Sequence, residues 1–260
     1  MLNESDRERA AQLLIDAERS GIPTQQLDQV FPNIEITDSY AIQKKIIDEK
    51  CQGGAVLRGH KIGLTSKAMQ STVGINEPDY GHLLNTMFYQ DGESISTEKL
   101  IVPRIEMELA FVLGKPLRGP GISLFDVLGA TDYVVPALEL IDGRSQYPRR
   151  IVDNIADNAA CAGVILGGRP IKPMDVDLRW VSGLLLKNGV IEESGVSAAV
   201  LGHPGLGVAW LANKLAQHDT SLQAGHIVLA GSFTRTVAVA SGDTIHADYG
   251  SLGSISVHFS

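Results

Sequence analysis

The chain has 260 residues, 44% of them hydrophobic and 20% charged, which is ordinary for a globular protein with a substantial core. Its net charge of -8 argues against nucleic acid or an anionic membrane surface as a partner. The two cysteines stand apart in the sequence, which suits a reducing compartment, and the charged start lacks the apolar core of a secretory signal. No apolar stretch reaches membrane-spanning length, so we expect a cytoplasmic protein with no membrane and no nucleic-acid partner.

The first 55 residues predict two helices. Ser5 and Glu8 have the spacing of a capping box at the start of the first helix. A second helix is expected to begin at Thr37 and to end at a glycine pair. No linker rich in proline, glycine or serine follows. We therefore expect residues 1–55 to form an N-terminal helical lobe on a β-rich catalytic domain of residues 56–260, the two making one structural unit.

The remainder of the chain predicts mixed helices and strands, with strands dominant. In order, the expected elements are a strand over 57–65, a short helix over 66–74, a loop over 75–92, apolar strands within 100–113 and 134–144, a helix over 151–162, a strand over 164–171, a hairpin turning at Asn188–Gly189, a helix over 204–217 and several strands from 226.

Three carboxylates occur in the two apolar strands. Glu106 and Glu108 are two residues apart in LIVPRIEMELAFVL, so they point to the same face of their strand. Glu139 lies in the second apolar run, VVPALELIDGR. A solvent-facing edge strand is the ordinary interpretation of such a pair. The apolar flanks argue instead for burial, which requires a compensating positive charge. Of the basic residues, only Arg104 lies near the pair on the same parity. Carboxylates without clustered histidine or cysteine favour a hard cation such as Mg²⁺ or Mn²⁺.

The sequence resembles the hydratase and decarboxylase branch of the fumarylacetoacetate hydrolase superfamily. This resemblance extends from about residue 57 to the C-terminus, and it rests on the segments GHKIGLTSKAMQ, EPDYG, PRIEMELAFVLGKPLRGPG, ATDYVVPALELIDGR, DNAACAGVILGG and LAGSFTR. It implies an α+β fold of that family's type, a β-roll or barrel-like sheet arrangement around a divalent metal. It also implies homo-oligomers in the cytoplasm.

The resemblance implies particular roles for five of these residues. Glu106, Glu108 and Glu139 would bind the metal, in agreement with the strand parity. Lys61 and Asp79 would be catalytic groups, with Lys61 assisting an enolate or moving a proton and Asp79 activating water. From sequence alone, a surface lysine and an ordinary turn aspartate remain the alternatives.

Three further residues are candidates for binding substrate. Ser232 and Thr234 of AGSFTR are possible donors to a substrate carboxylate, or else strand-end hydroxyls bonded to backbone. Arg144 is the first candidate for clamping a distal carboxylate, because a guanidinium binds a carboxylate in a fork. Three other arginines compete for that role, namely Arg58, Arg104 and Arg235.

The predicted activity is that of a metal-dependent hydro-lyase acting on a small molecule in the meta-cleavage of aromatic compounds. It would add water to a 2-hydroxy-2,4-dienoate or its 2-oxo-enoate tautomer, of the 2-oxohept-4-ene-1,7-dioate kind. Decarboxylation of 2-oxo-3-hexenedioate and hydration of 2-oxopent-4-enoate are the near alternatives. Hydrolysis of a carbon–carbon bond is a third possibility. It would need a histidine and acid pair, but the strand parity turns His60 away from Lys61. A binding protein without turnover is the non-enzymatic alternative.

Overall fold

A computed structural model describes the whole chain except residues 68–69 and 72–73. The helices are α1 (Glu4–Ser20), α2 (Leu27–Val30), α3 (Ile36–Gln52), α5 (Leu124–Ala130), α6 (Ile151–Ala156) and α7 (Pro204–Ala216). The strands are β1 (Leu57–Gly63), β2 (Asp79–Leu84), β3 (Phe88–Gln90), β4 (Ser94–Ile95), β5 (Arg104–Leu113), β6 (Thr131–Ile141), β7 (Cys161–Leu166), β8 (Ser182–Lys187), β9 (Val190–Val196), β10 (Ile227–Leu229), β11 (Val237–Ala238), β12 (Thr244–Asp248) and β13 (Ser254–Phe259). No helix in the described ranges is long and apolar enough to cross a membrane.

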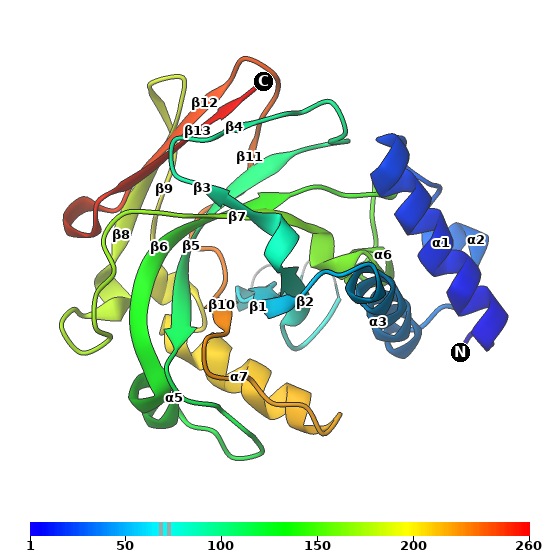
Figure 1. Ribbon diagram of the computed structural model, residues 1–260, viewed down its shortest axis with the longest axis horizontal. Coiled ribbons are helices and arrows are strands. Elements are labelled where there is room, and N and C mark those ends of the chain that lie inside the picture. Colours follow the sequence, from blue (N-terminus) through cyan, green and yellow to red (C-terminus); the bar gives the residue numbers. More distant parts are fainter. Residues whose placement is uncertain (68–69, 72–73) are drawn as a thin grey trace.

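Two sheets form the β-rich part of the molecule. The larger sheet has the order β2-β1-β10-β5-β6-β7-β3, and β11 adds to the edge of β5. The smaller has the order β4-β13-β12-β8-β9. Figure 1 shows the long strands β5 and β6 curving between α7 at one end and the smaller sheet at the other. This is the mixed α+β arrangement, with a curled sheet, that the sequence predicts.

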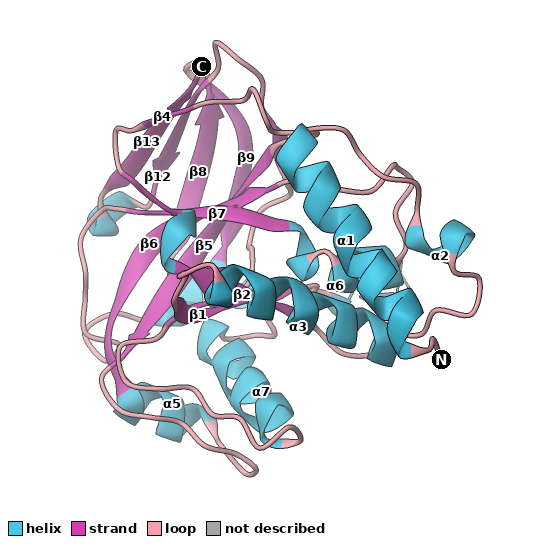
Figure 2. Cartoon of the chain, turned by 45° about the vertical axis from the view of Figure 1, so that its right-hand side comes forward, coloured by secondary structure: helices cyan, strands magenta, loops and turns pink. Residues whose placement is uncertain are grey.

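The helices α1 and α3 pack against each other, and α3 packs against α6, beside the larger sheet (Figure 2). Their shared core includes Leu14, Ile42 and Ala156. The predicted helices are confirmed, but the cap on the first one is wrong: α1 begins at Glu4. The side chain of Asn3 accepts a hydrogen bond from the Asp6 amide at 2.8 Å. Asparagine is as good an N-cap as serine, and because Asn3 is the cap, Glu4 and Ser5 both lie within the helix.

The loop predicted over 75–92 is wrong, because this segment contains β2 and β3. Pro78 precedes the first residue of β2, so its missing N–H removes no hydrogen bond from the sheet. Gly81 lies within β2, and this position requires glycine because a Cβ there would come 2.5 Å from the Asn158 carbonyl oxygen. The two residues interpreted as breakers are therefore compatible with a strand. The helix predicted over 66–74 falls partly outside the described residues.

The helix predicted over 151–162 is too long. α6 ends at Ala156, and the next turn has left-handed residues, with φ of 53° at Asn158, 51° at Ala159 and 58° at Ala160. β7 then begins at Cys161. This strained turn lies beside β1 and β2 and contributes backbone groups to the site described below. The hairpin at Asn188–Gly189 and the helix α7 are confirmed.

Candidate metal centre and active site

Three glutamates converge between the two longest strands. β5 and β6 pair antiparallel, and their register sets Glu106 directly opposite Glu139. Glu108 is two residues further along β5, on the same face. Carboxylate oxygens of all three residues lie within 4.8 Å of one another. The strand periodicity and the register therefore bring together the three acids that the sequence singles out.

This cluster carries more negative charge than the protein neutralises. Glu108 and Glu139 are completely buried, which contradicts the alternative of a solvent-facing edge strand. Glu108 Oε1 and both oxygens of Glu139 accept no hydrogen bond from the described residues. Burial, and then the neighbouring Glu139 carboxylate, raise the pKa of Glu106 to about 7. Burial likewise raises the pKa of Glu108 well above its usual range. Unpartnered carboxylate oxygens at one point fit a hard divalent cation.

Lys61 supplies the one positive charge in contact with the cluster in the described part of the chain. Its Nζ lies 3.2 Å from Glu139 Oε1 and donates a hydrogen bond to the carbonyl oxygen of Ala159, also at 3.2 Å. Burial acts to lower the pKa of the ammonium, but the carboxylates of Glu139 and Asp79 outweigh it and raise that pKa. Lys61 is therefore a buried ammonium ion, and the surface-lysine alternative is wrong.

Asp79 faces Lys61 from the neighbouring strand. β2 pairs Asp79 with Gly63 of β1, and a Cβ at Gly63 would lie 2.3 Å from Asp79 Oδ1. The Asn154 side chain donates a hydrogen bond to Asp79 Oδ2 at 2.8 Å, while Oδ1 has no hydrogen-bond partner among the described residues. Burial raises the pKa of Asp79, although Lys61 opposes that rise. The carboxyl is thus completely buried and aimed by one amide, unlike an ordinary turn aspartate.

A cavity of about 420 Å³ borders Lys61, Asp79 and Glu106. Arg104, an alternative candidate from the sequence, also lines it, together with two arginines and an asparagine that we did not assign to the site from sequence. The lining residues are Lys61, Gly63, Leu64, Asp79, Arg104, Glu106, Ile141, Tyr147, Arg149, Arg150, Ile151, Asn154, Ala159, Ala160 and Thr236. Arg104 and Glu106 have the same strand parity, and this alternation in the sequence indicates that Arg104 lies on the face of the acids.

Ser232 and Thr234, which we predicted as donors to a substrate carboxylate, are absent from the lining of this cavity. Ser232 Oγ donates to the carbonyl oxygens of Met107, at 3.3 Å, and Thr234, at 2.9 Å. Thr234 Oγ1 accepts a hydrogen bond from the Met107 amide at 3.3 Å. Their neighbour Gly231 donates its amide to Glu108 Oε2 at 2.8 Å. The segment therefore fixes β5 and orients Glu108 from behind.

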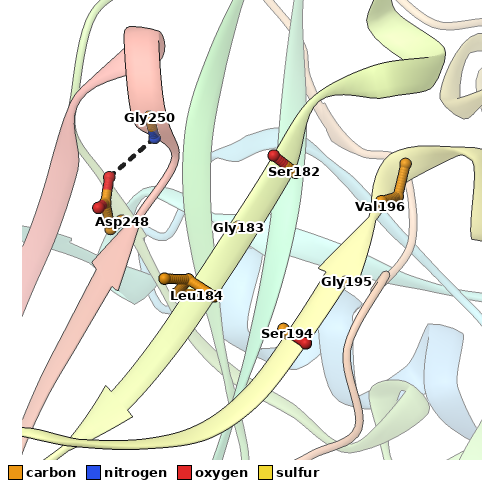
Figure 3. Close-up of a pocket in the computed structure, with 8 residues that line it drawn as sticks. All are labelled: Ser182, Gly183, Leu184, Ser194, Gly195, Val196, Asp248 and Gly250. Atoms are coloured by element: carbon orange, nitrogen blue, oxygen red, sulfur yellow. Dashed lines mark hydrogen bonds between the residues drawn. The ribbon is translucent and has the colours of Figure 1, made fainter.

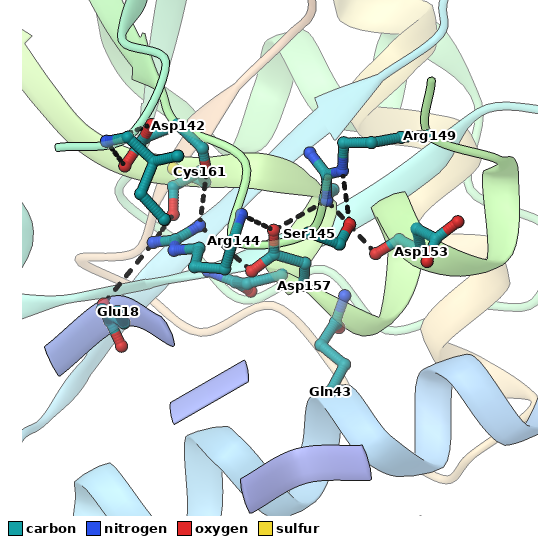
Figure 4. A network of polar contacts seen from close by, with 12 residues as sticks. Glu18, Gln43, Asp142, Arg144, Ser145, Arg149, Asp153, Asp157 and Cys161 are labelled. Carbon is teal, nitrogen blue, oxygen red and sulfur yellow. Dashed lines mark hydrogen bonds and ion pairs between the residues drawn. The ribbon is translucent and has the colours of Figure 1, made fainter. Parts of the chain in front are cut away.

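Arg144, which we predicted to bind a substrate carboxylate, is absent from the lining of this cavity and is held by protein groups instead. Figure 4 shows its buried guanidinium within a polar network. It donates to the carbonyl oxygens of Asp142 at 2.9 Å and Cys161 at 3.1 Å. It also pairs with Asp157 at 3.3 Å and Glu18 of α1 at 3.5 Å. Arg144 therefore ties the N-terminal helices to the strands that carry the acids.

His60 lies on the face of β1 opposite Lys61, as predicted. It is buried, and its ring centroid lies 5.0 Å from that of His82 and 6.0 Å from that of His226. Burial lowers the pKa of His60 well below its usual range, so the imidazole is neutral. It does not line the cavity, and therefore it makes no histidine and acid pair there.

A second pocket, of about 360 Å³, lies over the smaller sheet (Figure 3). Its lining is mostly small or apolar, and it includes Gly183, Leu184 and Gly195. Its one carboxylate, Asp248, accepts a hydrogen bond from the Gly250 amide at 2.8 Å. This pocket lacks the converging charged groups of a catalytic site.

The curled sheet and the buried acids define a member of the fumarylacetoacetate hydrolase family. The family model for the fumarylacetoacetate (FAA) hydrolase C-terminal region matches residues 60–260, and the chain belongs to this family. It is 59% identical over 256 residues to 2-oxo-hept-4-ene-1,7-dioate hydratase of Escherichia coli, covering 96% of each chain. It is 42% identical over 230 residues to 4-oxalocrotonate decarboxylase of Pseudomonas putida, covering 88% of this chain and 87% of the relative.

The solved structures agree with this assignment. The fold matches that of 4-oxalocrotonate decarboxylase from Pseudomonas putida G7, complexed with magnesium and adipate, with a TM-score of 0.97. The sequence identity is 38%, and the match covers 100% of this chain and 99% of that one. The predicted family, its hydratase and decarboxylase branch and its fold type are all confirmed.

Proposed function

We propose that this protein is a divalent-metal-dependent hydro-lyase that adds water to a 2-hydroxy-2,4-dienoate or its 2-oxo-enoate tautomer. The observation that carries the proposal is the convergence of three glutamates, two of them completely buried, beside Lys61 and next to the cavity that Glu106, Lys61 and Asp79 line. The 59% identity to a hydratase of 2-oxo-hept-4-ene-1,7-dioate supports a substrate of that kind.

The three glutamates would hold the metal ion. Glu106, Glu108 and Glu139 offer only carboxylate oxygens, which suits Mg²⁺ or Mn²⁺. Such an ion would bind the carboxylate and 2-oxygen of an α-keto acid and stabilise negative charge on that oxygen. The Gly231 amide holds Glu108 in position by its hydrogen bond to Oε2.

Lys61 and Asp79 would move the protons. The Lys61 ammonium, held by Glu139 and the Ala159 carbonyl, is placed to stabilise an enolate and to donate a proton to the carbon chain. Asp79, with its unpartnered Oδ1 and raised pKa, is placed to orient water and accept its proton during addition at C4. Asn154 fixes the orientation of Asp79.

Decarboxylation of 2-oxo-3-hexenedioate is the second candidate, favoured by the 42% identity to a 4-oxalocrotonate decarboxylase. Each reaction would pass through an enolate of its own 2-oxo acid, formed by proton transfer in hydration and by loss of CO₂ in decarboxylation. The higher identity to the hydratase supports hydration as the main activity.

The test is to incubate the purified protein and Mg²⁺ with each substrate and to identify the products by NMR. Metal-dependent formation of a 4-hydroxy-2-oxo acid from 2-oxohept-4-ene-1,7-dioate would support the proposal. CO₂ release without any 4-hydroxy product would refute it.

Three sequence-based expectations stay predictions. These are the division into a helical lobe (1–55) and a catalytic domain (56–260), the homo-oligomeric state and the cytoplasmic location. The choice between Mg²⁺ and Mn²⁺ is likewise a proposal, and metal titration of the purified protein tests it.

A further inference from the structure

Three arginines line the cavity, and two of them already form ion pairs with carboxylates of the protein. Arg149 forms an ion pair with the buried Asp157 at 2.7 Å, and Arg150 pairs with Asp28 at 2.9 Å. Arg104 forms no ion pair with any carboxylate of the described residues. Its Nη1 instead donates a hydrogen bond to the hydroxyl of Thr236 at 2.8 Å. A guanidinium held by a neutral hydroxyl retains its full charge for an incoming anion.

The position of Arg104 follows from strand geometry. It is the first residue of β5, two residues before Glu106, and therefore on the same face as Glu106 and Glu108. Its Cα lies about 7 Å beyond that of Glu106 along the strand. A ligand anchored by one end at the glutamates can therefore extend along β5 toward this guanidinium. Thr236, just before β11, limits the directions in which the guanidinium can point.

We propose that Arg104 binds the second carboxylate of a dicarboxylate substrate and is the residue that selects it over a monocarboxylate. This inference rests on the proposed function, because the first carboxylate must be held at the glutamate end. Arg144, which we first considered for this role, is excluded by its place outside the cavity.

An ion pair between Arg104 and the distal carboxylate would affect whether that carboxylate is lost in the reaction. A guanidinium pairs with an intact carboxylate and stabilises it in the ground state, so it opposes loss of that group as CO₂. Arg104 therefore favours a reaction in which the distal carboxylate is retained, as it is in hydration. The contact involves no covalent step: the substrate keeps both carboxylates, and the guanidinium keeps its protons.

Ligand binding tests the inference without any turnover. Adipate and hexanoate have the same carbon chain but differ by one carboxylate, and both can be titrated calorimetrically into the Mg²⁺-loaded protein. We expect wild type to bind adipate roughly 10- to 100-fold more tightly than hexanoate, the size of a charge-assisted hydrogen bond. Arg104→Gln should abolish this preference while still binding hexanoate. Arg104→Lys should restore part of it, since lysine supplies charge without the fork.

The matched control is Arg235→Gln. Arg235 is 87% exposed, pairs with Glu193 at 2.9 Å and lies outside the cavity lining. This variant should keep the full preference for adipate. A preference for adipate that survives Arg104→Gln, or its absence in wild type, would overturn the inference.

Turnover separates this inference from the proposed function. We expect Arg104→Gln to lower kcat/KM for the 1,7-dienedioate roughly 10- to 100-fold more than for 2-hydroxypenta-2,4-dienoate. Equal losses for the two substrates would count against Arg104 as the selecting residue. If wild type hydrates neither substrate, the proposed function fails, and the adipate titration still decides the role of Arg104.

Discussion

Glu106→Gln should make the metal-free protein more stable at pH 8, although it removes a charged group from the proposed active site. The substitution keeps the shape of the side chain and removes its charge. Burial and the neighbouring Glu139 raise the pKa of Glu106 from 4.5 to about 7. If fully expressed, that shift corresponds to about 3 kcal/mol of destabilisation above pH 7. Because the carboxylate borders the cavity, water screens part of this, and we expect a gain of about 1 to 3 kcal/mol.

The size of this effect depends on pH. A carboxyl whose pKa is raised on folding destabilises the protein above its folded pKa, and this penalty disappears as the pH falls toward the unfolded value. Wild type without metal should therefore become more stable from pH 8 to pH 5, and the variant should gain less. The penalty is fully present above about pH 7, where Glu106 is ionised in both the folded and the unfolded states.

Urea denaturation in the presence of a chelator, at pH 8 and pH 5, measures these differences. Adding Mn²⁺ should reverse the order at pH 8, since the variant loses one ligand and roughly two orders of magnitude in affinity. Asp132→Asn is the control, because Asp132 is 54% exposed and pairs with Lys172 on the surface. Equal stability of wild type and Glu106→Gln without metal at pH 8 would refute the reasoning.

Three further substitutions test the groups around the glutamates. Lys61→Met should lower kcat roughly 10²- to 10⁴-fold, yet Mn²⁺ titration should show affinity at least equal to wild type, since a competing cation is gone. Asp79→Asn should lower kcat by a similar factor while calorimetry finds adipate binding unchanged. Gly63→Ala should lower kcat roughly 100-fold, because its Cβ would meet Asp79 Oδ1 at 2.3 Å. Gly129→Ala, whose Cβ meets nothing within 4 Å, should leave kcat unchanged and raise Tm slightly, because Gly129 lies in α5 and alanine favours a helix. Equal losses of kcat from the two alanines would contradict this account.

The glutamate trio was predictable because it depends on local periodicity. Alternation places Glu106 and Glu108 on one face, and the apolar runs identify two buried strands. The same parity rule separates His60 from Lys61 and sets Arg104 on the face of the acids. Only the register opposite Glu139 needed the structure.

The rest of the site depends on contacts between distant segments. Asp79 begins a strand that the sequence did not predict, because Pro78 and Gly81 are usually found in loops. The need for glycine at position 81 follows only from the nearby backbone of Asn158. The left-handed turn after α6 supplies the carbonyl that binds Lys61, but its sequence resembles a helix. Arg144 lies three residues after β6 ends, and its side chain turns toward α1. The strand alternation that places Arg104 does not extend to Arg144, so the sequence could not place this arginine.

A crystal structure with Mn²⁺, using anomalous diffraction at the manganese edge, tests the central claim most directly. This account predicts one strong peak at about 2.0 to 2.4 Å from oxygens of Glu106, Glu108 and Glu139. Manganese bound elsewhere, with these three carboxylates left without a cation, would contradict it.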